Sequence, residues 1–347
     1  MSENNKTELN VSDLTKDDTL ALKGIALLLL LIHHLFYQNA GLYNDVLLWN
    51  GHYLIQEIGI MSKACVAIFV FLSGYDLTIS TEQNGGIKSL KDFYICRFKK
   101  LFLNYWFIWI IFVPVSYFLF DMTFEKTYQH NVSLQLMTDF WGIHNIVFGS
   151  TILCYNPTWW FYSCIIILYI FFPLLYKNVD FNVISTILGS IVVSLIPISH
   201  LECIQWYIFA FVLGIMFATH KSPPSNLYMP ISILVLFMIV RNFTKYPIFT
   251  DCLISIAFIQ LYRCGIICKP IKRILSFIGK HSMNIFLFHT FIYYFWFKEY
   301  IYSYKNPIVI LGILLSICLC ISTGLEWIKG LLLTKKNYEN KNCYYRR

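Results

Sequence analysis

The sequence LALKGIALLLLLIHHLFYQN, residues 20–39, decides the fold. Its apolar core is long enough for a helix that crosses a bilayer, which needs about 20 mostly apolar residues. Further stretches of comparable character occupy residues 58–80, 97–120, 158–176, 183–199, 203–219, 227–241, 250–267, 281–297 and 307–329. The sequence therefore predicts an all-α polytopic membrane protein with about ten transmembrane helices.

The composition of the chain argues for a membrane protein and against a soluble one. Of 347 residues, 57% are hydrophobic and 13% are charged, whereas soluble domains carry about 25% charged residues. A soluble chain of this length could not hide so much apolar surface from water. The net charge of +8 does not indicate nucleic-acid binding, because the basic residues lie between apolar stretches, where they set topology.

The distribution of basic residues predicts the orientation in the membrane. With a cytoplasmic N-terminus, the inner segments hold the clusters 88–100 and 263–280, Lys177, Lys221 and the tail from Lys329. The outer segments hold only Lys63, Lys126, Arg241, Lys245, Lys298 and Lys305. The positive-inside rule then predicts that both termini are cytoplasmic. We expect a tail without a signal peptide at 1–19, a transmembrane domain at 20–330 and a basic tail at 331–347.

One segment, residues 134–153, fits neither a span nor a simple loop. It is amphipathic and is interrupted by Asp139, Gly142, His144 and Gly149. We expect it to be re-entrant or interfacial, because it lacks the apolar length of a span.

Ionisable side chains inside the first span are the clearest sign of function. Lys23 and His34 are eleven positions apart, which puts them on nearly the same helix face, about 16 Å apart along the axis. His33 points about a quarter-turn away. A mid-membrane imidazole is suited to act as a general base, since its ordinary pKa is near neutrality. The alternative is that the two histidines only bond helix to helix.

Three further motifs place polar or small residues within or at the ends of spans. Ser73 and Gly74 would let a neighbouring helix or a ligand approach the backbone closely. Arg97 and Lys100 are three apart, so they lie on one helix face, where two cations would either grip phosphates or simply set topology. His289 is a second histidine near mid-depth. Two such histidines on different helices indicate a functional site more specifically than one histidine does.

In their order along the chain, these motifs resemble the acyltransferase-3 superfamily of bacterial inner-membrane acyltransferases, which modify cell-envelope glycans. The resemblance covers most of the chain. It is carried by Lys23-Gly-Ile-Ala with His34, Phe69 to Tyr75, Arg97-x-x-Lys100 with Tyr105-Trp106, Trp159-Trp160-Phe161 with Tyr169 and Pro173, and Gly279 to Ser282 with His289.

The resemblance implies a ten-helix fold in the bacterial cytoplasmic membrane and transfer of an acyl group, usually acetyl, from cytoplasmic acyl-coenzyme A to a sugar hydroxyl at the outer face. His34 and His289 are then the expected catalytic residues, and the donor-binding residues are expected to be Lys23, Ser73, Gly74, Arg97 and Lys100. The chain departs from the family where Lys23 and Lys100 replace arginines, and where Ile165 and Ile166 replace the paired glutamates of one branch.

The expected partners are acyl-coenzyme A, an envelope glycan or lipid-linked sugar, and membrane lipids, with homo-oligomerisation left open. No tightly bound cofactor is expected. Cys264 and Cys268 do not predict a metal site, because no second pair of His or Cys completes one. The rival function is a transporter or flippase without chemistry, since intramembrane His and Lys also suit proton coupling. An inert scaffold, the third alternative, would not need such groups.

Overall fold

The computed structural model describes residues 14–49, 51–128, 131–149, 152, 154–220, 226–243 and 247–332. Most of the predicted N-terminal tail, Lys221, Lys245 and nearly all of the predicted basic tail lie outside these residues.

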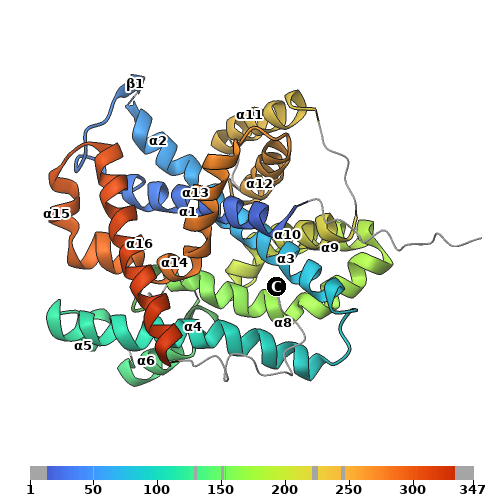
Figure 1. Ribbon diagram of the computed structural model, residues 1–347, viewed down its shortest axis with the longest axis horizontal. Helices are drawn as coiled ribbons and strands as arrows, with labels where there is room; N and C mark the ends of the chain where they lie inside the picture. Colours follow the sequence, from blue (N-terminus) through green and yellow to red (C-terminus); the bar gives the residue numbers. More distant parts are fainter. Residues whose placement is uncertain are drawn as a thin grey trace, which may run out of the picture.

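The described chain is almost entirely helical, which confirms the all-α fold (Figure 1). Its one sheet in this part of the chain is a short antiparallel hairpin of β1 (Leu47–Trp49) and β2 (His52–Tyr53). The helices are α1 (Lys16–Phe36), α2 (Leu54–Met61), η1 (Ser62–Ala64), α3 (Cys65–Gln83), α4 (Leu90–Leu119), α5 (Phe124–Thr127), α6 (Val132–Phe140), α7 (His144–Phe148), η2 (Pro157–Trp159), α8 (Trp160–Phe181), α9 (Val183–Leu195), α10 (Glu202–Thr219), α11 (Tyr228–Phe243), α12 (Pro247–Arg263), α13 (Lys269–Lys280), α14 (Ser282–Thr290), the π-helical segment η3 (Phe291–Trp296), α15 (Lys298–Ser303) and α16 (Pro307–Leu332).

Every predicted span coincides with one of these helices or with a continuous run of them. In the described chain, five helical runs are long and apolar enough to cross a membrane. They are Lys16–Phe36, Leu54–Gln83, Leu90–Leu119, Pro157–Phe181 and Pro307–Leu332. The remaining predicted spans correspond to shorter helices, so the total of ten spans and the cytoplasmic location of both termini stay predictions.

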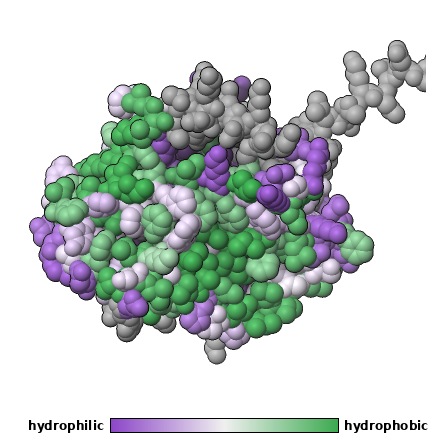
Figure 2. Space-filling model, turned by 90° about the horizontal axis from the view of Figure 1, so that it is seen from below, coloured by the Kyte–Doolittle hydropathy of each residue, from purple (hydrophilic) through white to green (hydrophobic). Residues whose placement is uncertain are grey.

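The outer surface of the helices is apolar, as lipid contact requires. Large hydrophobic side chains are exposed on several long helices, for example Ile110 and Phe118 on α4, Leu188 on α9, and Ile308 and Trp327 on α16. Figure 2 shows a broad hydrophobic area across one face, with hydrophilic residues gathered towards its two ends. A soluble protein rarely exposes a contiguous apolar area of this extent. The chain is an integral membrane protein.

Two helix crossings are tight enough to require glycine. Where α1 crosses α13, a Cβ on Gly24 would lie 2.1 Å from the Leu275 carbonyl oxygen, and one on Gly279 would lie 1.8 Å from the Leu20 oxygen. Without side chains at these positions the two backbones pack directly, as helices in lipid commonly do. The α1–α13 contact therefore fixes the helix that carries Lys23 and His34.

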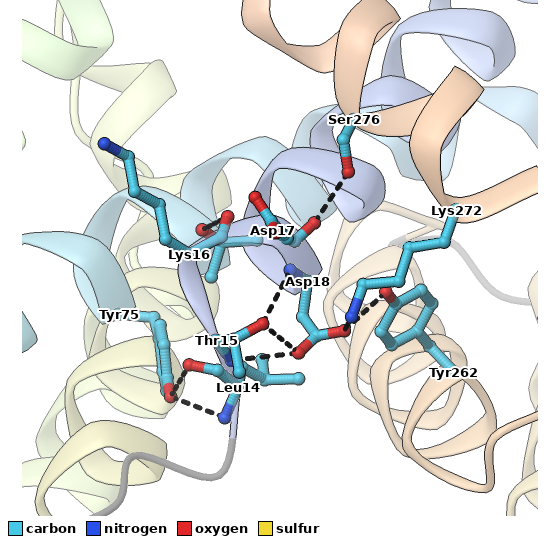
Figure 3. Close-up of polar contacts among 10 residues, drawn as sticks. Leu14, Thr15, Lys16, Asp17, Asp18, Tyr75, Tyr262, Lys272 and Ser276 are labelled. Atoms are coloured by element: carbon cyan, nitrogen blue, oxygen red, sulfur yellow. Dashed lines mark hydrogen bonds and ion pairs between the residues drawn. The ribbon is translucent and has the colours of Figure 1, made fainter. Parts of the chain in front are cut away.

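The start of α1 is anchored by a polar cluster (Figure 3). Thr15 and Asp18 form a capping box, in which each side chain bonds the backbone of the other residue and satisfies a free helix-end donor. The Asp18 carboxylate also pairs with the Lys272 ammonium at 2.5 Å and accepts a hydrogen bond from the Tyr262 hydroxyl at 2.7 Å. These contacts join α1 to α12 and α13 and set its depth along the bundle.

Candidate active site

The two predicted catalytic histidines meet in the structure. His34 lies near the C-terminal end of α1 and His289 near the C-terminal end of α14, and their ring centroids are 5.0 Å apart. The His34 imidazole makes no hydrogen bond with any described residue. His289 is completely buried. The fold therefore brings together two imidazoles that are 255 positions apart in the chain.

The hydrogen bonds of His289 fix which of its nitrogens carries a hydrogen. Nδ1 lies 2.9 Å from the Phe286 carbonyl oxygen and 3.0 Å from that of Ile285. A carbonyl oxygen only accepts, so Nδ1 must be the donor and Nε2 presents its lone pair in the neutral ring. The π-helical segment η3 begins two residues later, and Tyr293 from that segment stacks on His289 with ring centroids 6.0 Å apart. His289 is thus oriented as a hydrogen-bond acceptor.

His33 has a different environment from that of its neighbour. Its Nδ1 donates to the Gly59 carbonyl oxygen at 2.8 Å, and its ring stacks on Tyr37 with centroids 5.0 Å apart. This bond ties α1 to α2. The alternative role for the two histidines, a bond from helix to helix, therefore applies to His33. Neither ring nitrogen of His34 has a hydrogen-bond partner among the described residues, so both can bind a ligand.

A cavity of about 280 Å³ lies beside His34. Its walls come from the C-terminal half of α1, η1 and the start of α3, residues between 145 and 158, the first turns of α8 and α10, and Phe286 of α14. In the predicted topology, all these parts except α14 lie towards the outer side. The volume is near the lower end of small-molecule sites, about 300–1,000 Å³. The cavity gives His34 a place to meet a small ligand.

The predicted donor-binding cations gather at the opposite, predicted inner end. The Lys23 ammonium pairs with the Asp76 carboxylate at 2.6 Å, and Arg97 donates to the Ser80 hydroxyl at 2.8 Å. Lys100 lies within electrostatic range of both Lys23 and Arg97. Lys23 of α1 and Arg97 and Lys100 of α4 therefore form one cluster, together with Asp76 of α3, and we call this cluster the basic rim.

Ser73 and Gly74 lie next to the basic rim on α3. The Ser73 hydroxyl donates to the Phe69 carbonyl oxygen of its own helix at 2.8 Å and shares a hydrogen bond with Tyr169 of α8. A Cβ on Gly74 would lie 2.4 Å from the Phe211 carbonyl oxygen. At Gly74 the close neighbour is therefore a helix and not a ligand, because α10 fills the space beside this glycine.

The described part of the segment 134–153 contains α7 and most of α6, joined by a turn, and its re-entrant or interfacial placement stays a prediction; residues 150, 151 and 153 lie outside the described chain. The Tyr105 hydroxyl of α4 donates to the Asp139 carbonyl oxygen at 2.5 Å, which holds α6 against the bundle. The Asp139 carboxylate accepts from the Tyr128 hydroxyl at 2.7 Å and from the Tyr155 N–H at 2.6 Å. Burial raises the pKa of this carboxyl to about 7. Asn145 of α7 lines the cavity, so this segment closes the site on one side.

Sequence reasoning did not identify several residues of the cavity wall. The sequence singles out Lys63 only as an outer-side charge and Trp160 only as part of a family motif, and nothing in it marks Trp206 or Tyr207 as a site residue, yet all four line the cavity. Aromatic residues are common at membrane interfaces whether or not they bind a ligand. Their concentration at the starts of two helices was the available signal, but only the fold puts those helix ends beside His34.

The comparisons with known proteins agree with the predicted resemblance. A family model of the acyltransferase-3 type, described as an acyltransferase domain, matches residues 21–327. Neither the curated proteins nor the solved structures give a significant match. The family match covers nearly the whole chain, including both histidines and the basic rim. The chain therefore belongs to the acyltransferase-3 family, as an integral membrane protein with an acyltransferase domain.

Proposed function

We propose that this protein transfers an acyl group, acetyl in the simplest case, from cytoplasmic acyl-coenzyme A to a hydroxyl group of an envelope polysaccharide or a lipid-linked sugar. The observation that carries the proposal is the pair of imidazoles, His34 and His289, at 5.0 Å beside a cavity. Acyl transfer to a hydroxyl needs a base at the acceptor oxygen. His34 is available for that task because no described residue engages its ring by a hydrogen bond.

In the proposed reaction, His34 removes the proton of the acceptor hydroxyl while that oxygen attacks the thioester carbonyl. A carbon–oxygen bond forms and the carbonyl electrons move to the oxygen. The tetrahedral intermediate then collapses, the carbon–sulfur bond breaks, and the leaving coenzyme A thiolate takes the proton back from the His34 imidazolium. The products are an ester and free coenzyme A, and His34 ends neutral, as it began.

His289 is proposed to orient His34. Its Nδ1–H is held by the Ile285 and Phe286 carbonyl oxygens, so its Nε2 carries the lone pair that would accept a hydrogen bond from one ring nitrogen of His34; the Thr290 hydroxyl lies 3.5 Å from the same Nε2. That bond would select the tautomer of His34 in which the other nitrogen is unprotonated and can act as the base. An acyl-histidine intermediate is the alternative route.

The donor is proposed to bind with its phosphates at the basic rim and its thioester directed between α1 and α4. Arg97, Lys100 and Lys23 supply the positive charge expected for a site that binds phosphates. The acyl group is proposed to approach His34 from the side of the basic rim, and the acceptor from the cavity.

A carrier that moves a lipid-linked sugar without chemistry is the rival function. The family match and the His34–His289 contact support chemistry more directly, because transport does not require two adjacent imidazoles at the end of a cavity.

The test is transfer of radiolabelled acetyl from acetyl-coenzyme A by purified protein in liposomes, with envelope glycans added as acceptors. Wild type is compared with His34→Gln and with His220→Gln, a change at an exposed histidine at the end of α10. We expect glycan labelling by wild type and His220→Gln, and a loss of about 100-fold or more in His34→Gln. Undiminished transfer in a folded His34→Gln protein would rule out the proposed role, and absence of any turnover would favour the carrier.

A further inference from the structure

The cavity beside His34 has an unusual distribution of charge. Among the described residues in its wall, Lys63 carries the one permanent charge, and none is acidic. The Lys63 ammonium makes no hydrogen bond or ion pair with the described chain. A cation in a partly enclosed apolar site interacts more strongly with an opposite charge than it would in water.

The charges behind the wall leave this positive charge uncompensated. Asp251 of α12 lies within electrostatic range of Lys63, but its carboxylate pairs with the Arg241 guanidinium of α11 at 2.6 Å. Both members of that pair are buried, with 1% and 7% of their side chains exposed. Together the three side chains carry one net positive charge, and Lys63 is the member that faces the cavity.

One part of the cavity wall is aromatic. Trp160 of α8 stacks on Tyr207 of α10 with ring centroids 5.9 Å apart, and the Trp206 ring lies 6.3 Å from Trp160 in an edge-to-face arrangement. Flat aromatic surfaces pack well against the C–H face of a sugar ring, while a few polar groups fix its orientation. The Tyr207 hydroxyl is buried and has no hydrogen-bond partner among the described residues, so it is a donor available to a sugar oxygen.

We infer that the cavity binds a sugar ring that carries an anionic group, with the ring against Trp160 and Trp206 and the anion at Lys63. The inference rests on the proposed function, because it assigns this ring to the acyl acceptor. It goes further by giving the acceptor a charge: a uronic acid or a sugar phosphate is preferred over a neutral sugar. Buried donors left without a partner penalise a ligand that lacks the matching acceptor group.

The experiment is a binding titration that needs no acyl-coenzyme A, so its result is independent of catalysis. Protein in nanodiscs is titrated with methyl β-D-glucuronide and with methyl β-D-glucoside, and the tryptophan fluorescence of the cavity reports binding. We expect wild type to bind the glucuronide more tightly by about tenfold or more, as charge-assisted hydrogen bonds produce. Lys63→Met should abolish this preference, and Lys63→Arg should retain it.

Three further arms keep the result specific. Lys305→Met, at an exposed lysine outside the cavity wall, should leave the preference unchanged. Tyr207→Phe should weaken both sugars to a similar degree and should not remove the preference. Succinate, a carboxylate without a sugar ring, should bind much more weakly than the glucuronide.

Equal affinity for the two sugars, or no binding of either, would overturn the inference. Succinate that binds as tightly as the glucuronide would also overturn it, because Lys63 would then recognise a carboxylate without any sugar ring, for example that of a dicarboxylic acyl group. If the preference holds but acetyl transfer fails, the anionic-sugar site stands and the transferase mechanism does not.

Discussion

The basic rim and the cavity differ in how far the protein already satisfies its own polar groups. At the rim, Lys23 is paired with Asp76 and Arg97 with Ser80. In the cavity, His34, Lys63 and the Tyr207 hydroxyl have no hydrogen-bond partner in the described chain. A polar group in an apolar setting without a partner costs stability. The cavity groups are therefore the ones for which a ligand is the natural partner, while the rim groups combine binding with helix packing.

This difference has a consequence for mutations. Changes in the cavity should affect catalysis and binding more than stability, because few protein contacts are lost. Changes of Lys23 and Arg97 at the rim should affect both, because each of these side chains also holds two helices together.

The largest expected effect is that of the histidine pair. We expect His289→Gln to lower kcat by about 100-fold or more, and the His34→Gln/His289→Gln double variant to be little worse than His34→Gln alone, since residues that act as a unit are not additive. Single-turnover transfer from acetyl-coenzyme A in liposomes measures this, with melting temperature as the control for folding. Independent, multiplying losses would contradict the idea that His289 acts through His34.

A smaller effect is expected at the basic rim, where Lys23 is proposed both to bind the donor and to hold α1 against α3. The Lys23 and Asp76 side chains are 28% and 22% exposed, so Lys23→Met should cost about 1–3 kcal/mol of stability by leaving a half-buried carboxylate without this cation. It should also raise the KM for acyl-coenzyme A by about tenfold, as loss of one phosphate contact would.

The double variant Lys23→Met/Asp76→Asn is the matched control for that change. It removes both charges, so we expect thermal stability to return towards wild type while the KM stays high. If both return, Lys23 serves only to hold α1 against α3. Thermal unfolding in detergent and initial rates over a range of acyl-coenzyme A concentrations give the two readouts.

The smallest effect concerns pH and the segment that covers the cavity. Burial raises the pKa of the Asp139 carboxyl from 3.8 to about 7, so the folded protein holds this proton more firmly than the unfolded chain does. The stability that this group contributes is fully present below about pH 4 and is lost as the pH rises to about 7, by at most about 1.4 kcal/mol per pH unit.

Asp139→Asn removes this titration. The melting temperature of the variant relative to wild type should therefore rise as the pH increases from about 4.5 to about 8, and level off above that. Parallel pH profiles for the two proteins would show that Asp139 does not titrate in this window.

Much of the site was predictable because each of its main residues breaks a local pattern. His34 and His289 are polar residues within apolar stretches, where a polar group is costly, so the sequence alone predicts both as catalytic candidates, and the fold places them side by side. Lys63 breaks no such pattern, since a lysine at the outer end of a span is ordinary. Its place in the cavity wall depends on the packing of η1 against α1 and α12, which no local pattern encodes.

The sequence by itself determined where the long apolar helices lie, because a bilayer requires apolar segments of a minimum length with their backbone hydrogen bonds satisfied internally; it did not predict the short α13, which lies between two of the predicted spans. It also determined which of them carry costly polar groups. Only the tertiary structure decided which helices are neighbours, because a helix in lipid can be apolar on every side and its periodicity then says little about partners. Close contacts such as that of Gly24 with Leu275, and of Gly74 with Phe211, made that choice, and they put His34 beside His289 and the cavity.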